Sequence, residues 1–168
     1  MFRNIPWITD GANLFLEEKI NNREIKTVLE FGSGASTLFF ASKELNVISI
    51  EHDKEWYDKI QDELKNRNLS INNYLLLERP YNNICETLKD EKFDLVFIDG
   101  RDRVLCAESS FLLVKKGGYL ILDNDERSEY KKIHEILFSW DKNSYEQIGA
   151  DLTGWTAPHR WITTVWKK

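Results

Sequence analysis

The stretch that most constrains the fold, residues 28–37, joins a buried strand to a helix through two glycines. The aliphatic and β-branched run at residues 27–31 is typical of a buried parallel strand. Gly32 and Gly34 interrupt this run, and the residues from Ser36 onward predict the first turns of a helix. A loop without Cβ atoms lets a ligand approach the backbone, and a helix N-terminus presents N–H groups with partial positive charge. The sequence therefore predicts an α/β fold with a ligand site here, the alternative being an ordinary tight turn.

Glu30, at the end of this expected strand, limits the kind of ligand. A carboxylate beside the loop repels a pyrophosphate and attracts an ammonium or sulfonium group. An acidic residue, any residue and then Gly-x-Gly resembles motif I of the class I S-adenosylmethionine-dependent methyltransferases. The resemblance implies that S-adenosylmethionine is the cofactor. It would be bound by Glu30, Phe31, Gly32, Ser33, Gly34, Ser36, Thr37, Glu51, His52 and Asp99.

Glu51 ends a second expected strand, residues 47–50, and follows the first glycine by about 20 positions. At this distance a doubly wound fold places an acid on the ribose of a nucleotide ligand. A carboxylate accepts hydrogen bonds from both the 2′ and the 3′ hydroxyl. We therefore expect Glu51 to bind ribose, and His52 to serve as an adenine shelf or loop residue.

Two later segments, residues 93–98 before Asp99 and 119–122 before Asp123, resemble further motifs of the same methyltransferase class, so the resemblance covers at least residues 27–124. It implies a doubly wound, mostly parallel seven-stranded sheet whose last strand is antiparallel, with helices on both faces. We expect one domain, residues 1–168, with a short N-terminal helical extension at residues 1–22. Expected helices cover residues 12–20, 55–65, 104–114 and 126–140. The remaining expected elements are a turn at 115–118 and strands at 72–77, 145–148 and 161–166.

Acidic residues follow several of the expected parallel strands, and ligands bind beyond the carboxyl ends of such strands. Because the sulfonium is already activated, methyl transfer needs alignment of the reactants and removal of a proton. We expect Asp99, Arg101 and Asp102 to be catalytic. The resemblance extends to the catechol and caffeoyl-coenzyme A O-methyltransferases, and implies Mg²⁺ bound by Asp99, Asp123 and Asn124. Those enzymes carry Lys where this chain has Asp102, so the general base stays open.

Two alternatives to the metal site remain. Asp123 and Asn124 could simply cap the following helix, and Arg101 could neutralise the same carboxylates. Basic residues also gather at this edge, which favours an acceptor with a carboxylate or phosphate group unless they neutralise the acidic residues. They are Arg101, Arg103, Arg127, His159 and Arg160. For the acceptor we expect contacts from Trp7, Arg127, Trp155, His159 and Arg160.

Composition restricts the partners. The net charge of −5 argues against a surface that coats nucleic acid, and no apolar run reaches the length of a membrane span. Cys85 and Cys106 fit a reducing compartment, and the N-terminus lacks the apolar core of a signal peptide. We therefore expect a cytoplasmic protein that acts on a small-molecule acceptor, without nucleic acid or membrane partners. A homodimer is left open.

The sequence favours O-methylation of a small polar acceptor, which could be a sugar, an acid or a phenol. The alternative from the same fold is an NAD(P)-dependent Rossmann oxidoreductase, which is disfavoured because the third glycine of its fingerprint is missing. A protein that binds the cofactor without catalysis is the alternative from another functional class.

Overall fold

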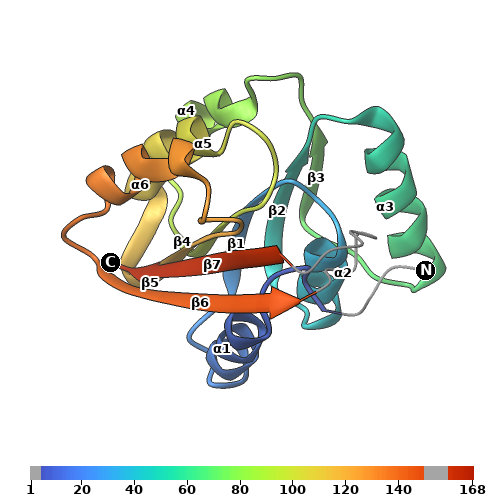
Figure 1. Cartoon of the computed structure of the whole chain (residues 1–168). Coiled ribbons are helices and arrows are strands. Elements are labelled where there is room, and N and C mark those ends of the chain that lie inside the picture. Colours follow the sequence, from blue (N-terminus) through green and yellow to red (C-terminus); the bar gives the residue numbers. More distant parts are fainter. Residues whose placement is uncertain (1–4, 150–158) are drawn as a thin grey trace.

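The computed structural model describes residues 5–149 and 159–168, which form one seven-stranded sheet in the order β3-β2-β1-β4-β5-β7-β6 (Figure 1). The first five strands are parallel, and β7 is antiparallel to both of its neighbours, β5 and β6. This arrangement confirms the predicted doubly wound sheet with an antiparallel last strand. The strands are β1 (Thr27–Phe31), β2 (Asn46–Glu51), β3 (Asn73–Leu76), β4 (Phe93–Ile98), β5 (Val114–Leu122), β6 (Asp141–Gly149) and β7 (His159–Lys167).

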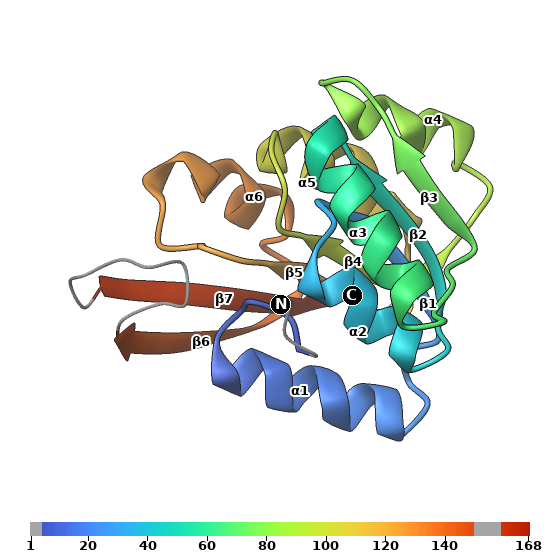
Figure 2. The ribbon, with the colours of Figure 1, turned by 90° about the vertical axis from the view of Figure 1, so that its right-hand side faces the viewer.

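Helices cover both faces of the sheet (Figures 1 and 2). Alternate strand residues enter different cores, because successive side chains of a strand point to opposite faces. Val28 packs with α1 (Asp10–Asn21) and α2 (Ala35–Ser42), and α3 (Lys54–Asn66) packs on α2. Leu29 belongs to the other core, which includes residues of α4 (Ile84–Thr87), α5 (Arg103–Ser110) and α6 (Lys131–Ile136).

The main difference from the sequence prediction lies between α5 and β5. The helix expected at residues 104–114 ends at Ser110, followed by a 3₁₀ turn (Phe111–Leu113), and the expected turn at 115–118 is part of β5. Gly117 has φ +79°, and the β4–β5 register shifts at this end of the strands, as in a β-bulge. The glycines therefore permit a bulge in a strand, whereas the sequence predicted a turn here, directly after a helix.

The last elements also differ in length. The helix expected at residues 126–140 is a 3₁₀ turn (Ser128–Tyr130) followed by the short α6, while β6 and β7 are longer than predicted. The remaining 3₁₀ turn is Tyr81–Asn83. No helix within residues 5–149 and 159–168 is long and apolar enough to cross a membrane.

The loops that follow β1 and β4 touch through their backbones. A Cβ atom on Gly32 would lie 2.4 Å from the Cα atom of Gly100, so only glycine permits this approach. Gly32 also has φ +93°, which L side chains rarely adopt. The contact brings the carboxyl ends of neighbouring strands together at one edge of the sheet, where the candidate site lies.

Candidate functional site

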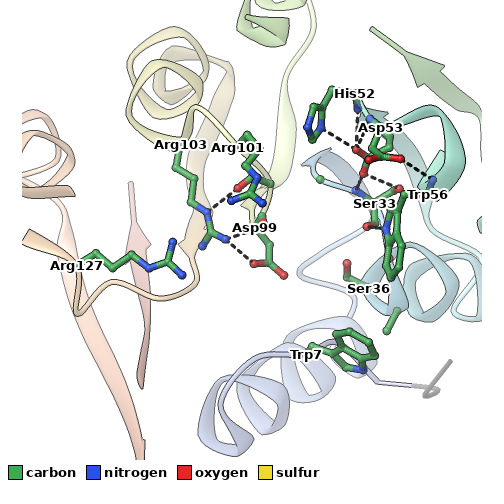
Figure 3. Close-up of a pocket in the computed structure, with 15 residues that line it drawn as sticks. Trp7, Ser33, Ser36, His52, Asp53, Trp56, Asp99, Arg101, Arg103 and Arg127 are labelled. Atoms are coloured by element: carbon green, nitrogen blue, oxygen red, sulfur yellow. Dashed lines mark hydrogen bonds and ion pairs between the residues drawn. The ribbon is translucent and has the colours of Figure 1, made fainter. Parts of the chain in front are cut away.

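A pocket of about 370 Å³ lies at the carboxyl edge of the sheet, within the size range of small-molecule sites (Figure 3). It is formed by the loops after β1, β2, β4 and β5, by the first residues of α2 and α3, and by Trp7 before α1. Its lining residues are Trp7, Gly32, Ser33, Gly34, Ala35, Ser36, Glu51, His52, Asp53, Trp56, Asp99, Gly100, Arg101, Arg103 and Arg127. The structure thus brings together seven of the ten predicted cofactor residues.

The other three, Glu30, Phe31 and Thr37, do not line the pocket. The Thr37 hydroxyl accepts from the Gly34 N–H at 2.9 Å and donates to the fully buried Glu30 carboxyl at 2.6 Å. Ser49 also donates to Glu30, at 2.5 Å, and burial raises the pKa of this carboxyl to about 7. Glu30 therefore lies beneath the glycine loop and holds its shape through Thr37.

Glu51 lines the pocket, but its carboxylate already accepts several hydrogen bonds. One oxygen accepts from the Ser33 N–H and hydroxyl, both at 3.1 Å. The other accepts from the backbone N–H groups of His52 at 2.7 Å and Asp53 at 2.9 Å, and lies 2.8 Å from the His52 ring. A carboxylate has about four acceptor positions, so a ribose hydroxyl would have to displace one of these donors. The Ser33 hydroxyl also contacts the Tyr74 hydroxyl at 2.7 Å, which gives it a second partner.

At the other end of the pocket, Arg103 holds the loops after β4 and β5 together. Its guanidinium donates to the carbonyls of Asp99, Gly100 and Asp123 and forms a 3.1 Å ion pair with the Asp99 carboxylate. Burial raises the pKa of the Asp99 carboxyl, and the charges of Arg103 and Arg127 oppose that shift. The Asp99 and Arg103 charges therefore offset each other at the pocket wall.

The predicted metal ligands do not fit a divalent cation. Arg103 supplies the positive charge beside Asp99, while Asp123 is buried and accepts from the Thr163 hydroxyl at 2.6 Å. Burial, reinforced by the charge of Asp99, raises the pKa of Asp123 and so favours its neutral form. Among the described residues, no group of three or more His, Cys, Asp or Glu side chains could hold a metal ion. The sequence left open that Arg101 neutralises these carboxylates, and in the structure Arg103 forms the ion pair with Asp99.

The predicted catalytic residues separate into two groups. Asp99 and Arg101 line the pocket, whereas Asp102 lies outside it and forms a two-point ion pair with Arg79, at 2.8 and 2.5 Å. Asp102 is therefore not placed to act as the general base. The buried Tyr81 hydroxyl donates to the Arg101 carbonyl at 2.6 Å and accepts from the Arg101 N–H, which fixes this loop.

Of the predicted acceptor residues, Trp7 and Arg127 line the pocket. Arg160 does not; it is exposed and pairs with Glu146 of the same hairpin at 2.7 and 2.9 Å. Trp155 and the side chain of His159 lie outside the described residues.

The sequence did not predict that Trp56 or Tyr81 belongs to the site, and it placed Arg103 at this edge without predicting its pairing with Asp99. Trp56 lies in the first turn of α3, and its indole N–H donates to the Ser33 carbonyl at 2.7 Å. Its position three residues after the capping Asp53, which accepts from the Trp56 N–H, was the available signal. Arg103 lies four residues after Asp99, a spacing that lets side chains pair when a helix begins nearby. The sequence holds no comparable signal for Tyr81, which reaches the site only through the tertiary fold.

No protein-family model matches this chain, and no curated protein matches it. Solved structures do match. An O-methyltransferase from Bacillus cereus in complex with S-adenosylhomocysteine is 18% identical, with a TM-score of 0.67 over 98% of this chain and 85% of that one.

In two further structures, the match includes a larger share of the other chain. A precorrin-6y C5,15-methyltransferase from Geobacter metallireducens is 20% identical, with a TM-score of 0.64 over 99% of this chain and 94% of that one. A precorrin 8w decarboxylase from Methanobacterium thermoautotrophicum is 15% identical, with a TM-score of 0.70 over 98% and 93%. At these identities the likeness establishes the fold and leaves the reaction open. The chain therefore has the fold of the class I S-adenosylmethionine-dependent methyltransferases.

Proposed function

We propose that this protein is an S-adenosylmethionine-dependent methyltransferase that methylates an oxygen of a small polar acceptor. The observation that carries the proposal is one pocket shared by the Gly-x-Gly loop, the acid at the end of β2 and Asp99 at the end of β4. The proposal is supported by the fold, since structures with this sheet include one bound to S-adenosylhomocysteine.

The residues present fit this cofactor. A Cβ atom on Gly34 would meet nothing within 4 Å, so the loop leaves open space where a ligand can approach the backbone. Ser33, Ser36 and Glu51 line the pocket with polar groups. Figure 3 shows the rings of Trp56 and His52 at the same end of the pocket as Ser33. These residues would hold the nucleoside part of the cofactor.

The cofactor, when bound, supplies a methyl group on a positively charged sulfur. The chain has to align an acceptor oxygen and take its proton. Asp99 is the acid that lines the arginine end of the pocket, and the hydrogen bond from Arg103 to its carboxylate is made to the Oδ1 atom. Because burial raises the Asp99 pKa, its carboxylate accepts a proton more readily than a solvated one. We therefore assign proton removal to Asp99, and include no metal ion in this step.

Calorimetric titration tests the proposal. S-adenosylhomocysteine should bind, while NAD should give no heat. Binding of NAD without binding of S-adenosylhomocysteine would overturn the proposal in favour of an oxidoreductase. Production of S-adenosylhomocysteine in a screen of hydroxyl compounds then separates an enzyme from a protein that only binds the cofactor.

A substitution at Gly34 tests whether the ligand binds in this pocket. Gly34 has an extended backbone, so Gly34→Leu should fold normally and fill the pocket with a side chain. We expect its thermal midpoint to stay unchanged. Its affinity for S-adenosylhomocysteine should fall by about a hundredfold, because the leucine side chain would occupy space that the ligand needs. Gly32→Ala is the contrasting variant, because its Cβ would collide with Gly100 and lower the stability itself. Unchanged affinity in Gly34→Leu would place the cofactor elsewhere.

A further inference from the structure

We propose that Arg101 and Arg127 form a subsite for an oxyanion, so that the methyl acceptor carries a carboxylate or phosphate group. This inference rests on the proposed function, because it assigns the arginine end of the pocket to the acceptor. Figure 3 shows the two residues on the Asp99 side of the pocket, with Ser33, His52 and Trp56 on the opposite side.

The charges at this end of the pocket are not balanced. Arg103 offsets Asp99 through their 3.1 Å ion pair, which leaves two positive charges, on Arg101 and Arg127. Neither guanidinium lies within 4.0 Å of a carboxylate among the residues that the structure describes. The protein as a whole carries a charge of −5, so two arginines without a carboxylate partner at one end of the cavity are not a consequence of composition. A ligand with negative charge would provide the missing balance.

The contacts of Arg127 are weak enough to be replaced by a ligand. Its guanidinium lies 3.4 Å from the Tyr130 hydroxyl and 3.4 Å from the Asn124 side-chain oxygen, at the long limit of hydrogen bonding. Both partners are neutral, so a charged oxygen at a shorter distance would bind the guanidinium more strongly. Arg103 provides the contrast, because its carbonyl and carboxylate contacts are four hydrogen bonds from a group with five N–H donors.

Arg101 is held in place by its backbone. The Tyr81 hydroxyl binds both the N–H and the carbonyl of Arg101, and the Tyr81 ring stacks on Phe31 at 6.1 Å between centroids. The next residue, Asp102, is anchored by its ion pair with Arg79. The loop therefore presents the Arg101 side chain from a fixed point, which lowers the entropy that a ligand must overcome on binding.

Arginine is suited to planar, two-point recognition of carboxylate and phosphate oxygens. Arg101 and Arg127 line the pocket from different loops, after β4 and after β5, so an oxyanion there is approached by guanidinium groups from two loops. The residues do not distinguish a carboxylate from a phosphate, so the experiment uses a probe of each kind.

The probes are inorganic phosphate and acetate, added at constant ionic strength to ¹⁵N-labelled protein, with and without S-adenosylhomocysteine. The Nε–Hε resonances of the arginines are followed by NMR and assigned from the single variants. We expect saturable shifts of the Arg101 and Arg127 signals. Arg101→Ala and Arg127→Ala should each weaken phosphate binding by about tenfold, the effect of losing one charged hydrogen bond. Tighter binding of phosphate than of acetate would indicate a phosphorylated acceptor, and the reverse order a carboxylated one.

Arg160→Ala is the matched control, because Arg160 is an exposed arginine paired with Glu146 outside the pocket. It should bind phosphate as the parent does. Absence of saturation up to about 50 mM of either anion, far above the range of a weak millimolar site, would overturn the inference. Equal phosphate affinity in the parent and in the Arg101→Ala, Arg127→Ala double variant would do the same. Because the titration is also made without S-adenosylhomocysteine, failure of that ligand to bind would count only against the proposed function.

Discussion

The two ends of the pocket differ in how their charged groups are paired. At the glycine-loop end, the Glu51 carboxylate is surrounded by donors from Ser33, His52 and Asp53. At the opposite end, Arg101 and Arg127 have no carboxylate within 4.0 Å among the described residues. The Glu51 carboxylate is thus paired within the protein, whereas the two arginines have positive charge that a ligand would pair with.

This difference separates residues that build the pocket from residues that recognise a ligand. Side chains whose hydrogen bonds are satisfied internally, such as Glu51 and Arg103, should affect folding when they are replaced. Side chains with weak contacts, such as Arg127, should affect binding and leave the free energy of unfolding nearly unchanged.

Replacing Arg103 gives the largest expected effect. Arg103→Ala would leave the charge of Asp99 beside the buried Asp123 without its counter-charge, and three backbone carbonyls without their donor. Arg103 is buried and Asp99 is half-buried, so the loss of this ion pair together with the three carbonyl contacts should cost about 3 kcal/mol of unfolding free energy. Urea denaturation followed by circular dichroism measures it.

Arg127→Ala is the control from the same end of the pocket, and its unfolding free energy should stay within about 0.5 kcal/mol of the parent. If the two variants were equally destabilised, the distinction between a saturated and an unsaturated arginine would fail.

The pH dependence of the unfolding free energy tests the role of Glu30 at the glycine-loop end. Burial raises its pKa to about 7 in the folded protein, so the native state holds a proton that the unfolded chain releases at lower pH. This contribution to stability is fully present below pH 4.5 and is lost as the pH rises through 7. From pH 5 to pH 8 the parent should lose about 2–3 kcal/mol of unfolding free energy from this group.

Glu30→Gln removes the titration and keeps an oxygen that can accept from Thr37 and Ser49. Its stability should depend less on pH than that of the parent by the same amount. Parallel pH profiles for the two proteins would show that Glu30 is ionised in the native state throughout this range.

Glu51 should contribute to both stability and ligand binding, and the effect of replacing it should be smaller. Glu51→Ala removes a charged hydrogen-bond acceptor from the pocket and should weaken binding of S-adenosylhomocysteine by about 1.5–3 kcal/mol. Because Ser33 and His52 also lose their acceptor, the thermal midpoint should fall as well. Calorimetry and a melting curve on the same sample separate the two effects. Unchanged affinity despite a lower midpoint would assign Glu51 to the loop alone.

The sequence predicted the sheet because its signals are local. The strand at residues 27–31, the two glycines and the acid at position 51 each follow from hydrophobic runs and spacing. The same local signals misplaced residues 115–118. A Lys-Lys-Gly-Gly run is typical of a turn, and only pairing with β4 shows that it continues a strand through a bulge.

Side-chain partners within the site were predicted less well than its position. Glu30 was expected to bind the cofactor and Asp102 to be catalytic, but Glu30 is buried below the loop and Asp102 pairs with Arg79. These directions depend on residues far apart in the sequence, such as Ser49 for Glu30. Periodicity shows which residues reach the edge of the sheet, whereas packing decides which of them face the cavity.

The smallest expected effect is that of removing divalent cations. In the structure the Arg103 guanidinium lies beside Asp99, and the buried Asp123 has a raised pKa that favours its neutral form. A site balanced in this way gains nothing from Mg²⁺, so affinity for S-adenosylhomocysteine and turnover of an identified acceptor should be the same with and without EDTA. Asp123→Asn should be nearly as active as the parent, because the amide oxygen can still accept from Thr163. Loss of activity in EDTA with recovery on adding Mg²⁺ or Mn²⁺ would contradict this, and would show that Arg103 moves away from Asp99 when the cation binds.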